Sequence, residues 1–203
     1  MPFVFKRLAL LLSIAAIAAG QAGKPSKDAA AFKAGTAVSY AAHQTNDKIS
    51  IGVDPYASGD KVKVAFGKLD PYEHGILPVL VVIQNDSDHS IRLDRLKVEY
   101  SGPNNNRVEA TPARDVRYLN GTDRPSAIPG PGGRVKVLKQ KNPLNVWEIE
   151  GRAFAARILP PMQSASGFFY FQTGLQREAT IYIAGISEAD TGKELLFFEL
   201  PLK

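Results

Sequence analysis

An aromatic ring beside two acids is the feature of the sequence best suited to chemistry. Trp147 is followed directly by Glu148, and Glu150 stands two residues after Glu148. The indole could stack on a sugar ring, and a pair of carboxylates is what hydrolysis of a glycosidic bond requires. These three residues predict a carbohydrate-binding or carbohydrate-active domain, although a half-exposed helix face has the same sequence pattern.

Metal and cofactor sites are not indicated. His43, His74 and His89 are far apart in the sequence, whereas two-histidine metal motifs place their ligands at helical or strand spacing. Asp86 and Asp88 offer oxygen ligands but lack the glycine and glutamate of a calcium loop, so a solvated turn explains them. The chain has no cysteine, which excludes thiolate ligands and disulfides. We expect no cofactor and no bound metal.

Motifs for an activated nucleophile or a phosphate cradle are also missing. The pattern Gly-x-Ser-x-Gly does not occur, and the glycine-rich stretch 130–133 lacks the lysine and the spacing of a phosphate loop. The sequence therefore predicts a protein that is not an enzyme, with the carbohydrate-active domain as the alternative.

The charge balance is weakly basic, with 25 Lys and Arg against 20 Asp and Glu. The bases are scattered except for a cluster at Arg134, Lys136, Lys139 and Lys141, so we expect no nucleic-acid partner. Arg134 and Lys136, together with the group at Trp147, form the predicted binding surface.

The N-terminus is typical of a secretory signal peptide over residues 1–22. Lys6 and Arg7 precede the apolar run 8–19, and small residues follow. Twelve apolar residues reach only about 18 Å of a roughly 30 Å hydrocarbon core, so a membrane span is not expected after cleavage. The prediction is an exported protein, periplasmic or secreted, with a linker or loosely docked arm over residues 23–47 and one domain over residues 48–203.

Short apolar runs with a period of two predict a mainly β domain. They are separated by turn residues and give about seven or eight strands with one short helix, which is typical of an immunoglobulin-like antiparallel β-sandwich. The predicted strands include residues 49–53, 61–66, 77–84, 167–172, 179–184 and 194–200, and a further short strand is an interpretation of residues 134–138.

Two details of this pattern make sharper predictions. The turn residues 85–90 predict a hairpin between the strand before them and the strand after them. The inward positions change parity between Leu93 and Leu96, which requires a bulge or a strand break near Asp94 and Arg95.

The middle of the chain combines a long loop with the predicted helix. Residues 120–134 hold three prolines and four glycines, and loops of this length are usually functional or mobile. Trp147, Phe154 and Ile158 are spaced seven and four residues apart, which favours a helix over residues 145–158.

Several predicted strands are apolar on both faces, so something must cover the outer face of their sheet. Residues 79–83, 168–171 and 195–198 show this most clearly. The predicted helix is the first explanation. The alternative is an exposed patch, which implies another envelope protein as partner or self-association.

Four segments carry a resemblance to known proteins: residues 52–56, 74–85, 165–171 and 191–200. Together they resemble uncharacterised bacterial exported proteins with an immunoglobulin-like β-sandwich domain. The matches fall on strands and turns, so the resemblance implies the fold and brings no catalytic residues. The interpretation is an exported, noncatalytic binding or accessory module.

Overall fold

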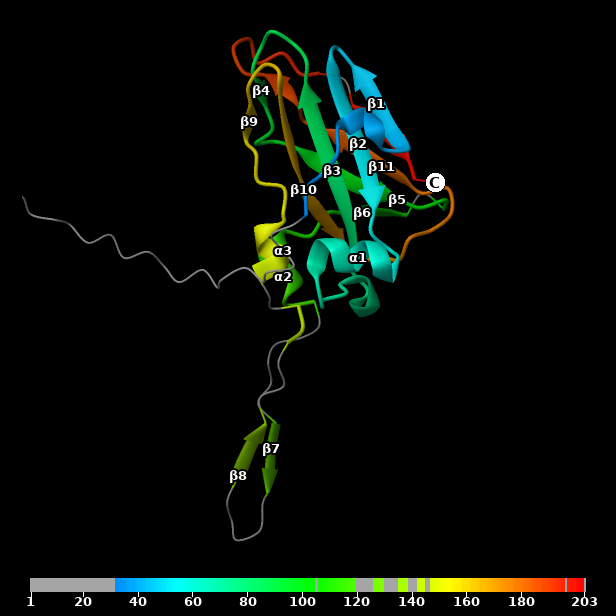
Figure 1. The fold of residues 1–203 in the computed structure, drawn as a ribbon, viewed down its shortest axis with the longest axis vertical. Coiled ribbons are helices and arrows are strands. Elements are labelled where there is room, and N and C mark those ends of the chain that lie inside the picture. The colour runs from blue at the N-terminus through cyan, green and yellow to red at the C-terminus, as the bar shows by residue number, and fades with distance from the viewer. Residues whose placement is uncertain are drawn as a thin grey trace, which may run out of the picture.

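Two four-stranded antiparallel sheets pack face to face in the computed structural model (Figure 1). The structure describes residues 32–104, 106–119, 126–129, 135–138, 142–144, 147–195 and 197–202. The strand order is β1-β2-β3-β10 in the first sheet and β13-β11-β5-β6 in the second. The predicted mainly β fold, an antiparallel β-sandwich, is confirmed.

The first sheet is built around β3. Its strands are β1 (Ala42–Asn46), β2 (Ile49–Pro55), β3 (Leu77–Asn85) and β10 (Gln163–Phe171). β3 lies between β2 and β10 and is buried along nearly its whole length, as its continuous apolar sequence predicts. Residues 42–46, which were expected in a linker or loosely docked arm, form an edge strand of this sheet.

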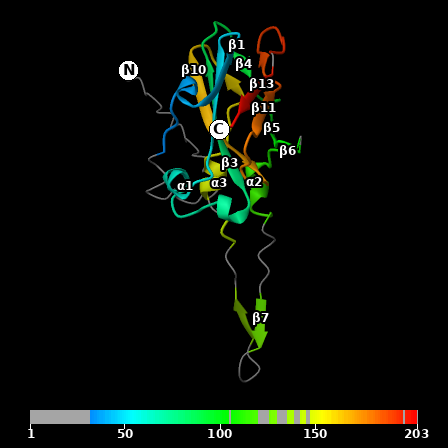
Figure 2. The ribbon, with the colours of Figure 1, turned by 90° about the vertical axis from the view of Figure 1, so that its right-hand side faces the viewer.

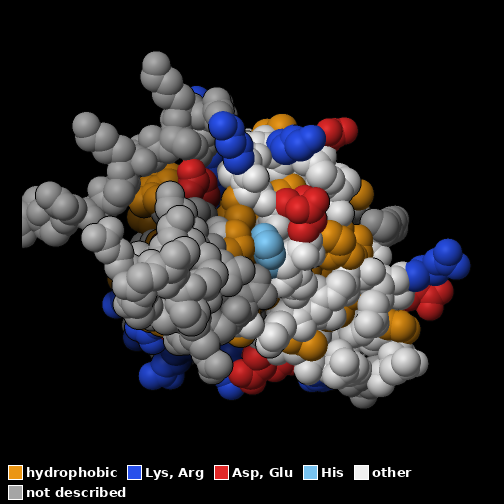
Figure 3. Space-filling model, turned by 90° about the horizontal axis from the view of Figure 1, so that it is seen from below, with side chains coloured by type: hydrophobic (Ala, Val, Ile, Leu, Met, Phe, Trp, Pro, Cys, Tyr) orange, Lys and Arg blue, Asp and Glu red, His pale blue; other side chains and the backbone are white. Residues whose placement is uncertain are grey.

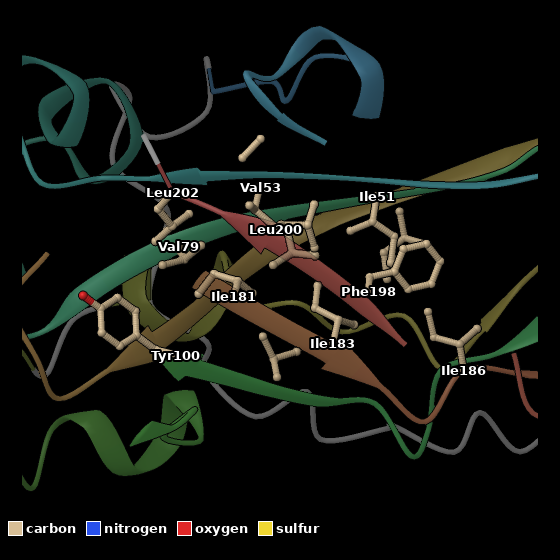
Figure 4. Close-up of a cluster of buried hydrophobic side chains, with 14 of the residues drawn as sticks. Ile51, Val53, Val79, Tyr100, Ile181, Ile183, Ile186, Phe198, Leu200 and Leu202 are labelled. Atoms are coloured by element: carbon tan, nitrogen blue, oxygen red, sulfur yellow. The ribbon is translucent and has the colours of Figure 1, made fainter. Parts of the chain in front are cut away.

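The second sheet supplies the other half of the core. It consists of β5 (Lys97–Ser101), β6 (Arg107–Glu109), β11 (Thr180–Ala184) and β13 (Phe198–Pro201). Alternate residues of β11 and β13 point toward the first sheet, where they meet Ile51, Val53 and Val79 (Figure 4). Burial of this aliphatic and aromatic surface is the main stabilising term of the fold.

A small third sheet caps one end of the sandwich. It joins β4 (Ile91–Arg92) to β9 (Ile158–Leu159) and β12 (Ser187–Glu188). The predicted hairpin across residues 85–90 is therefore wrong, because β4 pairs with β9 and β12 and not with β3. The Asn85 side-chain amide donates to the carbonyl oxygens of His89, Leu159 and Pro160, which fixes the chain as it leaves the first sheet.

The break predicted near Asp94 and Arg95 is confirmed. These two residues form a turn between β4 and β5, and the two strands belong to different sheets. The inward-facing positions change from odd to even because β4 and β5 belong to different sheets, and the turn between them resets which residues face the core.

The stretch expected as a strand over residues 61–66 is helix α1 (Gly59–Phe66). Val62, Ala65 and Phe66 are buried, whereas Val64 is 63% exposed. The buried positions therefore follow helical spacing. The alternation of Val62, Val64 and Phe66 suggested a strand, but these three residues do not share one buried face. Gly67, with φ of 65°, ends the helix.

The outer face of the first sheet is covered by the chain itself. The cover consists of α1, α2 (Ala113–Val116), α3 (Trp147–Gly151), the 3-10 turns η2 (Ala37–Ser39) and η3 (Tyr72–His74), and residues around them. Ala37, Phe66, Val116 and Ile149 pack over Leu80, Val82, Phe168 and Tyr170. None of the described helices is long and apolar enough to cross a membrane.

The helix predicted over residues 145–158 ends at Gly151. The prediction that Trp147, Phe154 and Ile158 share one helical face that covers the sheet is therefore wrong. After Gly151 the chain becomes extended, and the Phe154 amide donates to the Phe168 carbonyl at 3.1 Å. Ile158 is 60% exposed in β9. Ile149, the third residue of the short helix, covers the sheet where Trp147, Phe154 and Ile158 were expected to.

A two-stranded hairpin stands apart from the body. β7 (Ser126–Pro129) pairs with β8 (Val135–Leu138), and both views show the hairpin projecting beyond α2 and α3 (Figures 1 and 2). β7 lies inside the segment that was expected to be a loop, whereas β8 confirms the predicted strand.

Candidate functional site

One long side of the sandwich is open. Between β10 and the β5–β6 pair lies a cavity of about 340 Å³, which we call the side groove. The opposite long side is closed, because the Glu199 amide donates to the Gln44 side-chain oxygen at 2.9 Å and the Asn46 side chain donates to the Phe197 carbonyl. The side groove is therefore a gap between two sheet edges.

The path of the chain after β6 explains the gap. The Ala110 amide still donates to the Val98 carbonyl at 3.1 Å, but the next amide, that of Thr111, donates to Tyr170 of β10 at 2.7 Å. Pro112 follows and has no amide to continue either ladder. β5 itself begins at Lys97, so among the described residues only this end of the strand is left without a partner on its β6 side.

The walls of the side groove are apolar side chains at the margin of the core. Leu96, Ala110, Phe154 and Phe169 are only partly buried there, and they pack against the fully buried cluster between the sheets. The rings of Phe154 and Phe169 are stacked, with centroids 5.5 Å apart and planes at 24°. The core thus reaches solvent through this groove.

The β5–β6 wall carries charge. Glu99 of β5 lies directly opposite Glu109 of β6, an arrangement in which like charges repel. Arg107 offsets one of them by an ion pair with Glu99 at 3.4 Å, while no ion pair to Glu109 occurs among the described residues. Lys97 is the third charged residue of the lining. The rim near Glu109 is therefore acidic.

The lower end of the groove is held by buried polar contacts. Ala113 of α2 and Ala153, just after α3, line it. The Tyr170 hydroxyl donates to the Ile149 carbonyl at 2.7 Å and fixes α3 against β10. Burial raises the pKa of Tyr170 far above its usual value, so its hydroxyl remains a neutral donor.

Other perturbed groups lie in the outer cover, away from the side groove. Burial, followed by the charge of Asp54, raises the pKa of Tyr56, and burial lowers the pKa of Arg152. The Arg152 guanidinium lies 5.1 Å from the centroid of the Phe32 ring. The pKa shifts of Tyr56 and Arg152 therefore arise mainly from the burial of these side chains in the outer cover.

The predicted residues around Trp147 do not line the groove. Trp147 is half-buried, and its indole occupies the space that a side chain at Gly151 would need. Glu150 forms an ion pair with Arg117 of α2 at 3.0 Å, and Glu148 is half-buried. Lys136 lies in β8, and Arg134 lies outside the described residues. The structure therefore joins Trp147, Glu148 and Glu150 on one short helix but leaves Lys136 on the hairpin.

The three histidines also stay apart. His43 contacts the Tyr40 carbonyl, His74 lies in η3, and His89 contacts Asp190 at 3.1 Å. Hydrogen bonds from the backbone amides of Asp190 and Thr191, then that from His89, lower the pKa of Asp190. Within the described ranges, no group of three or more metal-ligating side chains comes together.

Where described residues are visible from below, apolar side chains are interspersed with charged and polar ones (Figure 3). The side groove is thus the feature that sequence reasoning missed. Its walls come from four separate segments, and the one local signal was Pro112, which limits the length of β6.

Comparisons with known proteins give structural neighbours only. No protein-family model matches the chain, and no curated protein matches it. A secreted protein from Mycobacterium tuberculosis, MPT63, is similar to 83% of this chain over 98% of its own, with 13% identity and a TM-score of 0.34. A functionally unknown protein from Listeria monocytogenes covers 79% of this chain and 80% of its own, with 9% identity and a TM-score of 0.34.

Proposed function

We propose that the protein is an exported, noncatalytic binding module that takes an extended segment of a polypeptide into the side groove. One observation carries the proposal: partly buried apolar side chains at the margin of the core line an open groove between the edges of the two sheets. The apolar run over residues 8–19 supports export.

The walls and the edge together favour a polypeptide ligand. The apolar surface of Leu96, Phe154 and Phe169 can bury a side chain of the ligand. Only Lys97 of β5 lies beyond Val98, so backbone hydrogen bonds to a ligand strand would be confined to this end of β5. A lipid chain would use the walls but not the edge.

The lining supports binding more than catalysis. A group inside the groove would be surrounded by hydrocarbon and aromatic rings, and the carboxylates of Glu99 and Glu109 stand at the rim. Glu99 is already engaged by Arg107. Acid–base work requires groups that surround the reacting bond.

Photo-crosslinking in the producing cell tests this function. A photoreactive residue at Lys97, on the groove rim, should give adducts whose mass spectra identify a polypeptide. The matched control is the same substitution at Lys63, an exposed lysine of α1. Adducts with glycan or lipid alone, or equal yields at the two positions, would overturn the proposal.

A further inference from the structure

The rim of the side groove carries two exposed charges of opposite sign. Glu109 of β6 and Lys97 of β5 both line the groove, and both side chains are exposed. Arg107 is engaged with Glu99 at 3.4 Å, and no ion pair joins Glu109 or Lys97 to another residue in the described part of the chain. One anionic and one cationic group therefore remain for a ligand to meet.

The strand register sets the spacing of these two charges. Val98 and Tyr100 are buried toward the core, so Lys97 and Glu99 point to the outer face of the second sheet. Glu109 lies directly opposite Glu99 and shares that face. Lys97 and Glu109 are thus diagonal neighbours on adjacent segments, a position for which the separation is about 7 to 8 Å.

Below the rim the groove is apolar and small. Its volume of about 340 Å³ lies at the lower end of the roughly 300 to 1,000 Å³ of ligand pockets, so one large side chain suits it. The stacked rings of Phe154 and Phe169 and the side chain of Leu96 form its walls. Such walls favour an aromatic or large aliphatic group.

We propose that the ligand is an extended segment in which a large apolar residue stands between a basic residue and an acidic residue. This inference rests on the proposed function and names the class of polypeptide that the side groove takes. Residues two apart in an extended chain point to the same side and lie roughly 6.6 Å apart. When the middle side chain enters the groove, its neighbours stay at the rim, the basic one beside Glu109 and the acidic one beside Lys97.

Other charge patterns fit the rim less well. With basic residues on both sides of the apolar one, the second cation meets Lys97. With acidic residues on both sides, the second anion meets Glu109. Because the rim is exposed, each mismatch should lower the affinity by about two- to fivefold. Complementary charges of this kind select among ligands, while the apolar contact supplies most of the affinity.

Titration with short peptides tests the proposal. The mixed peptide is acetyl-Ala-Lys-Phe-Glu-Ala-amide, and the basic and acidic peptides carry Lys or Glu on both sides of Phe. Binding to the purified chain is followed by the amide NMR signals of Ala110 and Thr111, which line the groove. The mixed peptide should bind about two- to fivefold more tightly than the other two. Replacing its Phe by Ser should weaken binding at least about tenfold.

Neutral variants assign each preference to one side chain. Glu109→Gln should abolish the discrimination against the acidic peptide, and Lys97→Gln should abolish that against the basic peptide. Lys63→Gln is the matched control, because it removes an exposed cation of α1 outside the groove. It should leave both preferences unchanged. Since Glu109 and Lys97 are exposed, neither substitution should disturb folding.

The outcomes separate the ligand class from the function of the groove. Equal affinities for the three peptides would overturn the charge pattern, and so would Lys63→Gln changing the preferences as much as Lys97→Gln. If either result occurs while the crosslink at Lys97 still captures a polypeptide, the groove function stands and only the ligand class fails. If that crosslink yields glycan or lipid adducts alone, the proposed function fails and this inference fails with it.

Discussion

The two long sides of the sandwich differ in how they end. At β1 and β13, side-chain amides of Gln44 and Asn46 bond to the backbone of the other sheet and close the gap. At β10 and β6, the chain crosses between the sheets at Thr111, and beside this crossing partly buried side chains at the margin of the core line the side groove. Polar side chains that reach across close one side, whereas the early crossing on the other side leaves an open groove.

The largest predicted effect is on the closed side. Leu200 of β13 is 1% exposed inside the cluster between the sheets. Leu200→Ala should lower the free energy of unfolding by about 3 kcal/mol, because it leaves a cavity in rigid surroundings. Denaturant unfolding measures this, and a loss below about 1 kcal/mol would mean that the closed side is not tightly packed.

The corresponding change on the open side should cost less. Phe169→Ala removes a larger side chain, but that ring is partly exposed in the side groove. We expect a loss of about 2 kcal/mol, below the 3 to 5 kcal/mol typical of a fully buried phenylalanine. A loss larger than that of Leu200→Ala in the same unfolding experiment would contradict the contrast between the two sides.

Tyr170 anchors the open side to its cover, and this contact should respond to pH. Tyr170→Phe removes the hydrogen bond to Ile149 and should cost about 1 to 2 kcal/mol at neutral pH. Because burial raises the pKa of Tyr170 in the folded state, the unfolded chain loses this proton first as pH rises above about 10, and stability falls.

Unfolding midpoints at pH 7 and above pH 10 check this prediction. The wild-type chain should lose stability at alkaline pH more steeply than Tyr170→Phe. Burial also raises the pKa of Tyr56 and Tyr100, so part of the alkaline loss should remain in the variant. Equal slopes for the two proteins would exclude Tyr170 as a source of the loss.

The smallest expected change in the free energy of unfolding comes from removing the hydrogen bond between Gln44 and Glu199, which closes the side opposite the side groove. Gln44→Ala leaves the Glu199 amide without its 2.9 Å acceptor at an exposed edge, where water can replace it. We expect a loss of about 0.5 to 1 kcal/mol in unfolding and faster hydrogen exchange at Glu199. Unchanged exchange at this amide would show that the side is closed by packing alone.

Strands were predictable where their periodicity was unambiguous. The continuous apolar run of β3 and the parity change near Asp94 follow directly from how side chains alternate along a strand. Helix α1 was not predictable in this way, because residues 62, 65 and 66 also fit helical spacing and only packing on the first sheet decides between the two.

The site was less predictable than the fold. Phe154 and Phe169 are 15 residues apart in the sequence and become neighbours because the chain turns extended after Gly151 and follows β10. Which strand edge stays open depends on the crossing at Thr111, a tertiary event with no local signature apart from Pro112. Trp147 stood out in the sequence, yet it packs over Gly151 on a short helix.

The contact between β1 and β13 also constrains how the chain can fold. Gln44 and Glu199 are 155 positions apart, so this side cannot close until the chain has been synthesised as far as Glu199. Contacts of such large sequence separation slow folding. Until this contact forms, an incomplete chain would keep its aliphatic core residues exposed and would be prone to aggregation.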